Sequence, residues 1–352
     1  MNIKIISSGS YIPTKVINNT TFDQFDFRDE HGNPLKDSNA RTAYKLQQIT
    51  GIEERRYVED NLVSSDIATI ASENAIKKAG IDRESLDYII LAHNFGDVKH
   101  GTIQSDSVPS LASRVKHNLK IQNPTCVAFD VLFGCPGWLQ GVIQAYAFMK
   151  AGMAKRCLVI GAETLSRVID LHDRDSMIYA DGAGATILEL TNEEGGILSV
   201  ESASFTFDEA NFIHFGKSYN PDLDKDTKYI KMFGRKIYEF ALSNVPLAMK
   251  NCVDKSGIDI TRIKKVMIHQ ANEKMDEAIV KRFFELYDMA MPENIMPMNI
   301  QKLGNSSVAT LPTLYDMIIN KKLETHNLEK GDIVLFASVG AGMNINAFTY
   351  QV

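Results

Sequence analysis

Two segments of this 352-residue chain share one pattern, and this internal repeat constrains the fold more than any other feature. In each segment an amphipathic helix ends at a glycine, a short loop follows, and a buried strand then begins. The first copy predicts a helix over Asp66–Lys78 and a strand over Leu86–Asn94. The second predicts a helix over Arg235–Asp254 and a strand over Ile263–Gln270. A chain built in this way is expected to form two similar α/β units.

A Gly-Ala-Gly tripeptide lies later in each copy, at 182–184 and at 340–342. Each tripeptide precedes a predicted strand, over 185–190 in the first copy and over 344–350 in the second. The same features in the same order indicate a duplication. Alternating helices and β-branched strands predict an α/β fold with parallel or mixed sheets.

The duplication divides the chain into an N-terminal half, residues 1–195, and a C-terminal half, residues 196–352. Two polar, turn-rich insertions interrupt this pattern, Phe25–Arg41 in the first half and Asp208–Lys228 in the second. We interpret the second insertion as a solvated loop.

Composition excludes several classes of protein. The net charge of -6 argues against a nucleic-acid partner. No run approaches the roughly 20 apolar residues of a membrane span, and the N-terminus does not have the pattern of a signal peptide. The four cysteines show no zinc spacing, so no metal site is expected. Three of them, Cys126, Cys157 and Cys252, lie in apolar runs and are expected to be reduced core residues, which fits a cytoplasmic protein.

Cys135 lies in a turn of small residues that joins a predicted buried strand over Cys126–Val131 to an apolar helix. Pro136 suits the first position of a helix, because its missing N–H is not needed there. Cys135 would then lie at a helix N-terminus, whose partial positive charge favours the nucleophilic thiolate. The alternative is a buried structural cysteine.

Two further motifs follow in the second half. His269 opens the sequence His-Gln-Ala-Asn at the end of a predicted strand, the position at which an α/β protein presents side chains to a ligand. Asn305 follows Gly304 and precedes two serines and a predicted helix over Leu311–Ile319. Taken singly, each residue has a simpler explanation: a buried histidine with satisfied hydrogen bonds, and an ordinary asparagine in a turn.

Taken together, the cysteine turn, His-Gln-Ala-Asn and Gly-Asn-Ser-Ser resemble the Cys-His-Asn triad of β-ketoacyl-ACP synthase III, a family of the thiolase superfamily. Further matches extend over most of the chain, at 8–13, 51–56, 160–166 and 181–185. The resemblance implies a thiolase-like fold in which two duplicated α/β halves form α-β-α-β-α layers.

The resemblance also implies a mechanism. Cys135 is acylated by an acyl-CoA or acyl-ACP thioester, and the backbone N–H groups of Cys135 and Ala341 form the oxyanion hole. Malonyl-ACP then loses CO2, and His269 and Asn305 donate hydrogen bonds to the enolate, which attacks the acyl group. Neither a metal nor a redox cofactor is required. The pathway is fatty acid biosynthesis or a related lipid or polyketide pathway.

Substrate contacts follow from the same resemblance. Arg167 matches the arginine that faces the adenine of coenzyme A. Lys274, Lys281 and Arg282 share one side of the helix that follows His269, and in the family this side receives the acidic acyl carrier protein. A solvated charged face is the alternative.

The family implies a homodimer, with a partner loop drawn from His93–Ser107 closing the acyl pocket. His93 and Asn94 replace small hydroxyl residues common in the family, and Phe25–Arg41 is longer than usual and could gate the entrance. A degradative thiolase would need a second cysteine at 340–343, and an elongating synthase would need a histidine in place of Asn305. A Cys-His-Asn thioester hydrolase or protease and a non-catalytic scaffold subunit remain as alternative functions.

Overall fold

Two β-sheets form the framework of the computed structural model, which describes residues 1–323 and 325–352. The first sheet is mixed and has the strand order β1 (Asn2–Tyr11), β7 (Asp181–Thr191), β6 (Arg156–Thr164), β4 (Tyr88–Ala92), β5 (Val127–Val131). The second has the order β11 (Ile263–Ile268), β12 (Ile333–Gly340), β13 (Asn344–Gln351), β8 (Gly196–Ser204). In each sheet the repeated strand, β4 or β11, pairs in parallel with a neighbour. The predicted α/β class with mixed sheets is therefore confirmed.

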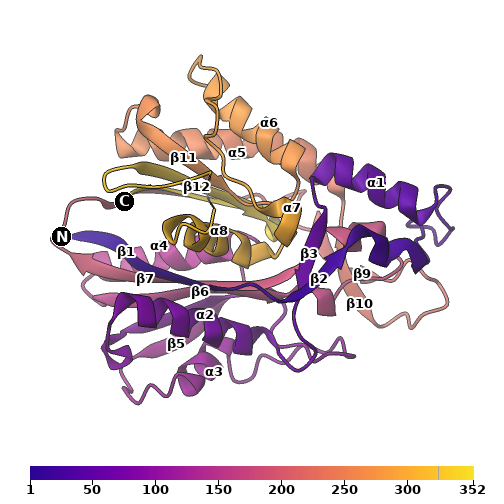
Figure 1. Ribbon diagram of the computed structural model, residues 1–352, viewed down its shortest axis with the longest axis horizontal. Helices are drawn as coiled ribbons and strands as arrows, with labels where there is room; N and C mark the ends of the chain where they lie inside the picture. Colours follow the sequence, from indigo (N-terminus) through magenta and orange to yellow (C-terminus); the bar gives the residue numbers. More distant parts are fainter. Residues whose placement is uncertain (324) are drawn as a thin grey trace.

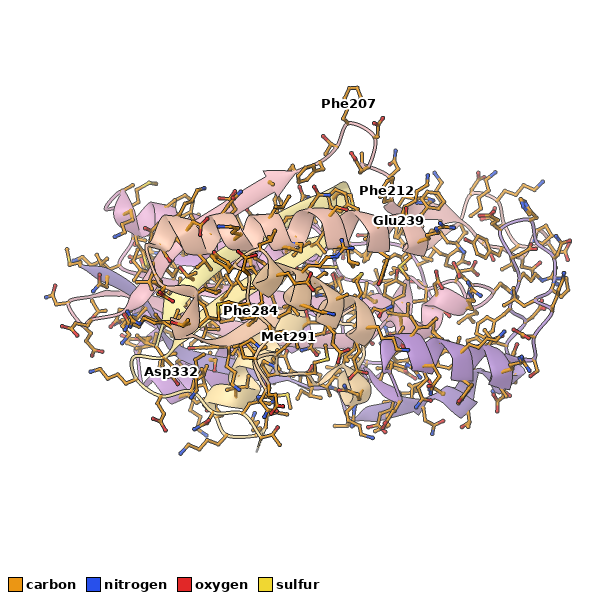
Figure 2. All side chains as sticks on the ribbon, turned by 90° about the horizontal axis from the view of Figure 1, so that it is seen from above. Phe207, Phe212, Glu239, Phe284, Met291 and Asp332 are labelled. Carbon is orange, nitrogen blue, oxygen red and sulfur yellow. The ribbon has the colours of Figure 1, made fainter. Side chains whose placement is uncertain are left out.

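Helices separate and cover the two sheets, giving five layers (Figure 1). Helices α4 (Gly137–Lys150) and α8 (Thr310–Ile319) lie between the sheets. The outer face of the first sheet is covered by α2 (Ser64–Ala79) and α3 (Leu111–Asn118). The outer face of the second is covered by α5 (Gly234–Ser256) and α6 (Glu273–Glu285), which lie side by side in Figure 2. This is the predicted α-β-α-β-α arrangement.

The central helices connect the sheets through one apolar core. Trp138 of α4 is fully buried and packs against Phe336 of β12, with ring centroids 5.8 Å apart. Its indole N–H donates to Thr186 Oγ1 of β7, on the opposite sheet, at 3.2 Å. Burying an aromatic side chain of this size stabilises the fold by about 3 kcal/mol, so the only tryptophan holds α4 and the residues before it in place.

The repeated helices end as predicted. Gly80 and Gly257, with φ values of +64° and +69°, are the C-caps of α2 and α5. The first sheet uses only strands before residue 195 and the second only strands after it. The division into halves at this point stays a prediction, because α8 of the second half packs on β1 and β7 of the first.

Smaller elements gather at one end of the molecule. They are β2 (Lys15–Asn18), β3 (Glu54–Tyr57), α1 (Asn39–Thr50), α7 (Ile300–Leu303), β9 (Ile213–Lys217) and β10 (Lys228–Met232). The structure also contains short 3-10 turns at 19–24, 83–85, 165–167, 174–178, 260–262, 307–309 and 341–343. Beyond this framework, the loop between β8 and β9 carries Phe207 away from the fold (Figure 2).

Two predictions about local structure are wrong. The insertion 208–228 is not entirely a loop, because residues 213–217 form β9 and pair with β10. The first Gly-Ala-Gly does not precede a strand but lies inside β7, where Gly184 packs so closely on Pro312 and Thr313 that a side chain would not fit. The second tripeptide begins at the last residue of β12 and precedes β13, as predicted.

All four cysteines are free, and Cys126, Cys157 and Cys252 are buried as predicted. Among the described residues, no helix has the combination of length and apolar character needed to cross a membrane.

Candidate active site

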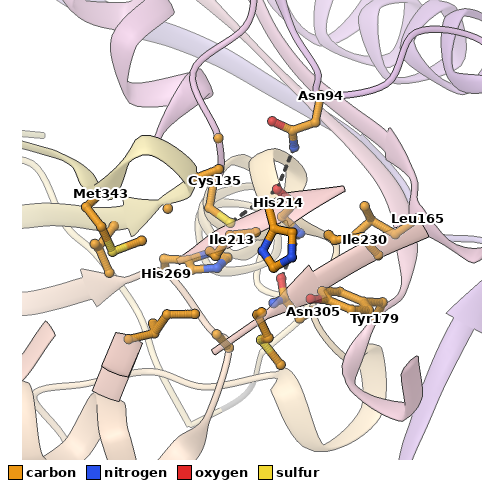
Figure 3. A pocket seen from close by; sticks show the side chains of 18 of the residues that line it. Asn94, Cys135, Leu165, Tyr179, Ile213, His214, Ile230, His269, Asn305 and Met343 are labelled. Carbon is orange, nitrogen blue, oxygen red and sulfur yellow. Dashed lines mark hydrogen bonds between the residues drawn. The ribbon is translucent and has the colours of Figure 1, made fainter. Parts of the chain in front are cut away.

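Cys135, His269 and Asn305 come from distant parts of the sequence and line one cavity of about 250 Å³ (Figure 3). Cys135 lies between β5 and α4, His269 directly follows β11, and Asn305 follows α7. Most of the remaining wall is apolar. The apolar residues that line it are Phe95, Leu165, Ile213, Phe215, Ile230, Met232, Ile237, Ala271, Met275, Val339 and Met343. The structure thus brings together the three residues that the sequence motifs selected.

Cys135 stands just before α4. The helix begins at Gly137, with Pro136 as the N-cap rather than as the first helical residue, because its ψ of 4° is not helical. Burial raises the pKa of the Cys135 thiol to about 11, and a hydrogen bond from Ser307 Oγ, 3.3 Å from Sγ, lowers it only in part. The expected thiolate is therefore not the resting form. Burial of the sulfur thus opposes the thiolate that the helix N-terminus was expected to favour.

Two glycines let the segments around Cys135 and Ala341 touch. Gly134 has φ of +66°, and a side-chain carbon on it would lie 2.6 Å from the Ala341 nitrogen. A side-chain carbon on Gly340 would lie 2.4 Å from the Cys135 nitrogen. Only glycine fits such contacts. Ala341 also lines the cavity, so both residues of the predicted oxyanion hole border the same space.

The amide of Asn305 has a fixed orientation. Its Oδ1 accepts a hydrogen bond from the Ser307 backbone N–H at 2.8 Å. Because the oxygen is engaged with the backbone of its own turn, the Nδ2 group, which can only donate, is left for the cavity. Asn305 is 6% exposed, so this donor has little access to bulk water.

The hydrogen bond between His269 and Thr310 determines which tautomer the neutral imidazole adopts. The Thr310 hydroxyl lies 2.9 Å from the Ser307 carbonyl oxygen, which can only accept, and 2.7 Å from His269 Nδ1. The single hydroxyl proton goes to the carbonyl, so Nδ1–H must donate to Thr310 and Nε2 must carry the lone pair. Nε2 has no partner among the described residues. Burial lowers the pKa of His269 to about 3, so the ring is neutral in the empty cavity.

Several wall residues were not selected from the sequence. His214 and Tyr179 contribute polar side chains beside Asn305 (Figure 3). His214 was missed because it lies in the insertion interpreted as a loop. Alternation of apolar side chains along 213–217 and 228–232 is the signal that could have indicated a hairpin with one face toward a cavity.

Other predicted site residues lie outside this cavity. Arg167 is 8% exposed, and its Nη2 donates to the Glu59 carbonyl at 3.0 Å. It lines a separate hollow, shared with Phe25 of the first insertion, and no residue of 25–41 lines the cavity of Cys135. The described residues contain no group of three His, Cys, Asp or Glu that could hold a metal ion.

The three basic residues of α6 are exposed. Lys274 precedes Met275, which lines the cavity. Lys281 lies 4.0 Å from Glu285, and Arg282 Nη1 donates to the Leu242 carbonyl at 3.1 Å. Of the three, Lys274 is therefore the one whose neighbour in the sequence borders the cavity.

Comparisons with known proteins agree on one family. The family model described as 3-oxoacyl-[acyl-carrier-protein (ACP)] synthase III matches residues 129–205, and the corresponding C-terminal model matches residues 253–352. The chain is 30% identical to the β-ketoacyl-ACP synthase III of Prochlorococcus marinus, over 99% of this chain and 95% of that protein. It is 31% identical to the enzyme of the same name from Staphylococcus aureus strain JH1, over 100% of this chain and 99% of that protein.

A solved structure shows the same similarity in three dimensions. The 3-oxoacyl-ACP synthase III of Aquifex aeolicus is 27% identical, and its alignment covers 99% of this chain and 100% of that one with a TM-score of 0.82. The likeness extends over both sheets and all five layers, and it confirms the thiolase-like fold predicted from the sequence.

Proposed function

The chain belongs to the 3-oxoacyl-ACP synthase III family, an acyl-transferring class of condensing enzymes, and we propose that Cys135, His269 and Asn305 carry out its reaction. An acyl group moves from acyl-CoA or acyl-ACP to Cys135 and then condenses with malonyl-ACP, with loss of CO2. The observation that carries this proposal is the meeting of the three side chains in one apolar cavity. The pathway is fatty acid biosynthesis or a related lipid or polyketide pathway.

Acylation begins with proton transfer from the Cys135 thiol to His269 Nε2. The lone pair of Nε2 is available because Nδ1–H is held by Thr310. As the proton leaves, the sulfur attacks the thioester carbonyl carbon, so that a free thiolate does not have to form in the cavity before the attack. The bond from that carbon to the coenzyme A sulfur breaks, and the released thiolate takes a proton from solvent. His269 is left as imidazolium, with an N–H at both nitrogens.

The oxyanion formed in this step needs donors close to the sulfur. The backbone N–H groups of Cys135 and Ala341 are suited to this role, because Gly134 and Gly340 let their segments come into contact. Backbone donors in a buried site are fixed before the reaction, so they stabilise the developing charge without reorganisation.

Condensation requires a proton on His269 Nε2. Burial alone disfavours it, but the carboxylate of malonyl-ACP brings a negative charge into the cavity and so favours the imidazolium. Malonyl-ACP loses its carboxylate as CO2, and the electron pair forms an enolate whose oxygen accepts from His269 Nε2–H and Asn305 Nδ2. The enolate carbon attacks the acyl carbonyl, the bond to the Cys135 sulfur breaks, and the sulfur recovers the proton from His269. This sequence balances protons and charge, and neither a metal nor a redox cofactor is needed, because loss of CO2 supplies the carbanion.

Two further substrate contacts are proposed outside the cavity. Arg167 is assigned to coenzyme A by the family pattern alone, since its guanidinium faces backbone carbonyls. Lys274, Lys281 and Arg282 are assigned to the acidic carrier protein, and Lys274 has the best position, next to the cavity wall.

A homodimer is proposed through the free edge of β5. This strand is the last of its sheet, and Val127 and Leu132 beside it are 47% and 68% exposed. Val108 is 87% exposed and lies near the same edge, because Asp130 of β5 caps the N-terminus of α3 through the Leu111 N–H. An exposed apolar edge strand favours pairing with a second copy. The cytoplasmic location stays a prediction from the reduced cysteines.

Intact-protein mass spectrometry tests the assignment of Cys135. The wild-type chain is exposed to a panel of acyl-CoA and acyl-ACP thioesters, and the mass gained identifies the primer. Cys135→Ser should gain no acyl group. Cys252→Ser is the matched control, because Cys252 is buried beside Ser199 and does not line the cavity, and it should be acylated normally. Acylation that persists in Cys135→Ser would remove the basis of the proposal.

A further inference from the structure

A chain of hydrogen bonds lies behind Cys135 and is built from residues that the steps above do not use. Ser307 Oγ lies 3.3 Å from Cys135 Sγ. Asn94 Nδ2, just after β4, lies 3.0 Å from the same Ser307 oxygen. That nitrogen also lies 2.6 Å from Oε2 of Glu163, which is 1% exposed near the end of β6. Figure 3 shows the bonds from Asn94 and from Cys135 to the Ser307 hydroxyl as dashed lines; Glu163 is not drawn there.

The number of protons on each group determines which atom donates in each of these hydrogen bonds. The Asn94 amide nitrogen has two hydrogens and no lone pair, so one hydrogen goes to Glu163 and the other to Ser307 Oγ. Ser307 Oγ accepts the second, so its own proton cannot point toward Asn94. Among the described residues, the only remaining partner within hydrogen-bond distance is the Cys135 sulfur. The Ser307 hydroxyl is therefore a donor to Sγ.

Glu163 fixes the orientation of Asn94. Its Oε2 accepts from both the backbone N–H of Asn94, at 3.0 Å, and the side-chain amide. If the amide were turned over, its oxygen would face this carboxylate oxygen and would accept the Ser307 proton instead. The sulfur would then lose its donor. Burial raises the pKa of Glu163 to about 8, so the carboxyl is protonated at neutral pH. Its proton belongs on Oε1, which has no partner among the described residues, so Oε2 stays an acceptor and keeps the amide from turning over.

Ser307 also links the three residues assigned to the reaction. Its φ of +51° is in the left-handed region, and its backbone N–H donates to Asn305 Oδ1. Its carbonyl accepts from Thr310, which in turn holds His269. A residue kept in an unfavourable backbone conformation by several hydrogen bonds is typical of a functional site.

We propose that Asn94 and Glu163 are positioning residues that hold the Ser307 hydroxyl as a hydrogen-bond donor to the Cys135 sulfur. The inference rests on the proposed role of Cys135 as the nucleophile. The donor stabilises the negative charge that the sulfur acquires as its proton leaves, and it does so in a site where burial opposes that charge. Asn94 acts through Ser307, and Glu163 orients Asn94; an ionised Glu163 also raises the pKa of the Cys135 thiol directly, through its negative charge.

The test measures the thiol itself. Iodoacetamide alkylation of Cys135 is followed by mass spectrometry at several pH values between about pH 7 and about pH 10, below the raised pKa of the thiol. In this range the rate is proportional to the fraction of thiolate, so a rise of one unit in the apparent pKa lowers the rate about tenfold at every pH. A hydrogen bond to a charged group is worth about one pH unit or more, so Ser307→Ala should raise the apparent pKa by about that amount. Asn94→Leu should raise it by about half as much. No acyl substrate takes part, so failure of the proposed condensation would not affect this result.

The double variant Asn94→Leu, Ser307→Ala separates a positioning role of Asn94 from a general disturbance of the structure around Cys135. If Asn94 acts through the hydroxyl, Asn94→Leu should cause no further rise in the Ser307→Ala background. An equal rise in both backgrounds would overturn the proposal, as would an unchanged profile in Ser307→Ala. The other titratable groups facing the cavity or the chain of bonds, His214, His269, Tyr179 and Glu163, are the same in every variant.

Two further variants serve as controls. Ser306→Ala removes the hydroxyl of the neighbouring serine, which is 7% exposed and makes no hydrogen bond to Cys135 in the described structure, and it should leave the profile unchanged. Asn94→Ala replaces Asn94→Leu if the larger side chain prevents folding, and it should show the same dependence on Ser307. A shift in Ser306→Ala as large as that in Ser307→Ala would count against a specific donor.

Discussion

Replacing Thr310 by valine tests whether the proton on His269 Nδ1 matters for acylation. Valine has nearly the same shape but cannot accept from Nδ1 or donate to the Ser307 carbonyl. In the proposed first step, the imidazolium formed by proton transfer is stabilised by its hydrogen bond to Thr310. A hydrogen bond to a charged group contributes about 1.5–3 kcal/mol, so its loss should slow acylation by about 10- to 150-fold.

The assay is single-turnover acylation of Cys135, quenched with acid and read by intact-protein mass spectrometry. Thr313→Val is the matched control, because Thr313 is in the same helix, is equally buried at 5% exposure and makes only a 3.5 Å bond to the Ala183 carbonyl. It should acylate at nearly the wild-type rate. Thr310→Ser keeps the hydroxyl and should restore most of the lost rate.

Stability must be followed alongside the rate. Thr310→Val leaves two buried groups without partners, and each costs about 1–3 kcal/mol, so the free energy of unfolding should fall by about 2–6 kcal/mol. Rates are therefore compared at a temperature where urea titration shows every variant folded. Wild-type acylation by folded Thr310→Val, or an equal loss in Thr313→Val, would refute the assigned tautomer and its role.

Three more predictions follow from the site and its surroundings. Asn305→Ala should still acylate but should release CO2 from malonyl-ACP about 10²–10³ times more slowly, as measured by CO2 trapping. Lys274→Glu combined with Lys281→Glu should raise the KM for malonyl-ACP at low salt, with little effect on acylation by acyl-CoA and a smaller effect as salt rises; an unchanged low-salt KM would place the carrier elsewhere. Burial raises the pKa of Glu163 to about 8, above its usual 4.5, so the protonated form stabilises the fold, and this contribution is lost as pH rises through about 8. Urea midpoints should therefore show the wild type losing stability relative to Glu163→Gln between about pH 5 and about pH 8, by up to about 1.4 kcal/mol per pH unit, and parallel curves would contradict the raised pKa.

The sequence was sufficient for features that depend on local pattern. Glycine C-caps at Gly80 and Gly257 indicated where two long helices end, because only a residue that tolerates positive φ closes a helix in this way. Alternation of helices and strands indicated the layered α/β class. The motifs around Cys135, His269 and Asn305 each follow or precede a regular element, and the cavity brings them together as expected.

Features that depend on burial were not predictable. The helix N-terminus suggested a thiolate at Cys135, but the desolvation of the sulfur can be judged only once the cavity walls are placed. The β9 hairpin was missed because the polar residues around it dominate the insertion 208–228. Ser307 and Thr310 were identifiable as small polar residues, but the direction of their hydrogen bonds depends on partners distant in the sequence.

Asn94 and Glu163 illustrate the same limit. Glu163 stands in an apolar strand, and a carboxyl group there is a signal that it has a partner, since burying one is costly. The sequence does not say that the partner is Asn94, 69 residues earlier, or that the pair reaches Cys135 through Ser307.

A single turnover of acylated enzyme with malonyl-ACP tests whether Cys135, His269 and Asn305 perform a decarboxylative condensation. The chain is first acylated on Cys135 and freed of excess thioester, and malonyl-ACP is then added while the masses of both proteins and the released CO2 are measured. If the three residues carry out the condensation, the enzyme returns to its unmodified mass, one CO2 appears for each acyl group lost, and the carrier holds a 3-oxoacyl chain. Release of the acyl group as a free acid, with malonyl-ACP unchanged, would contradict the account and would indicate a thioester hydrolase.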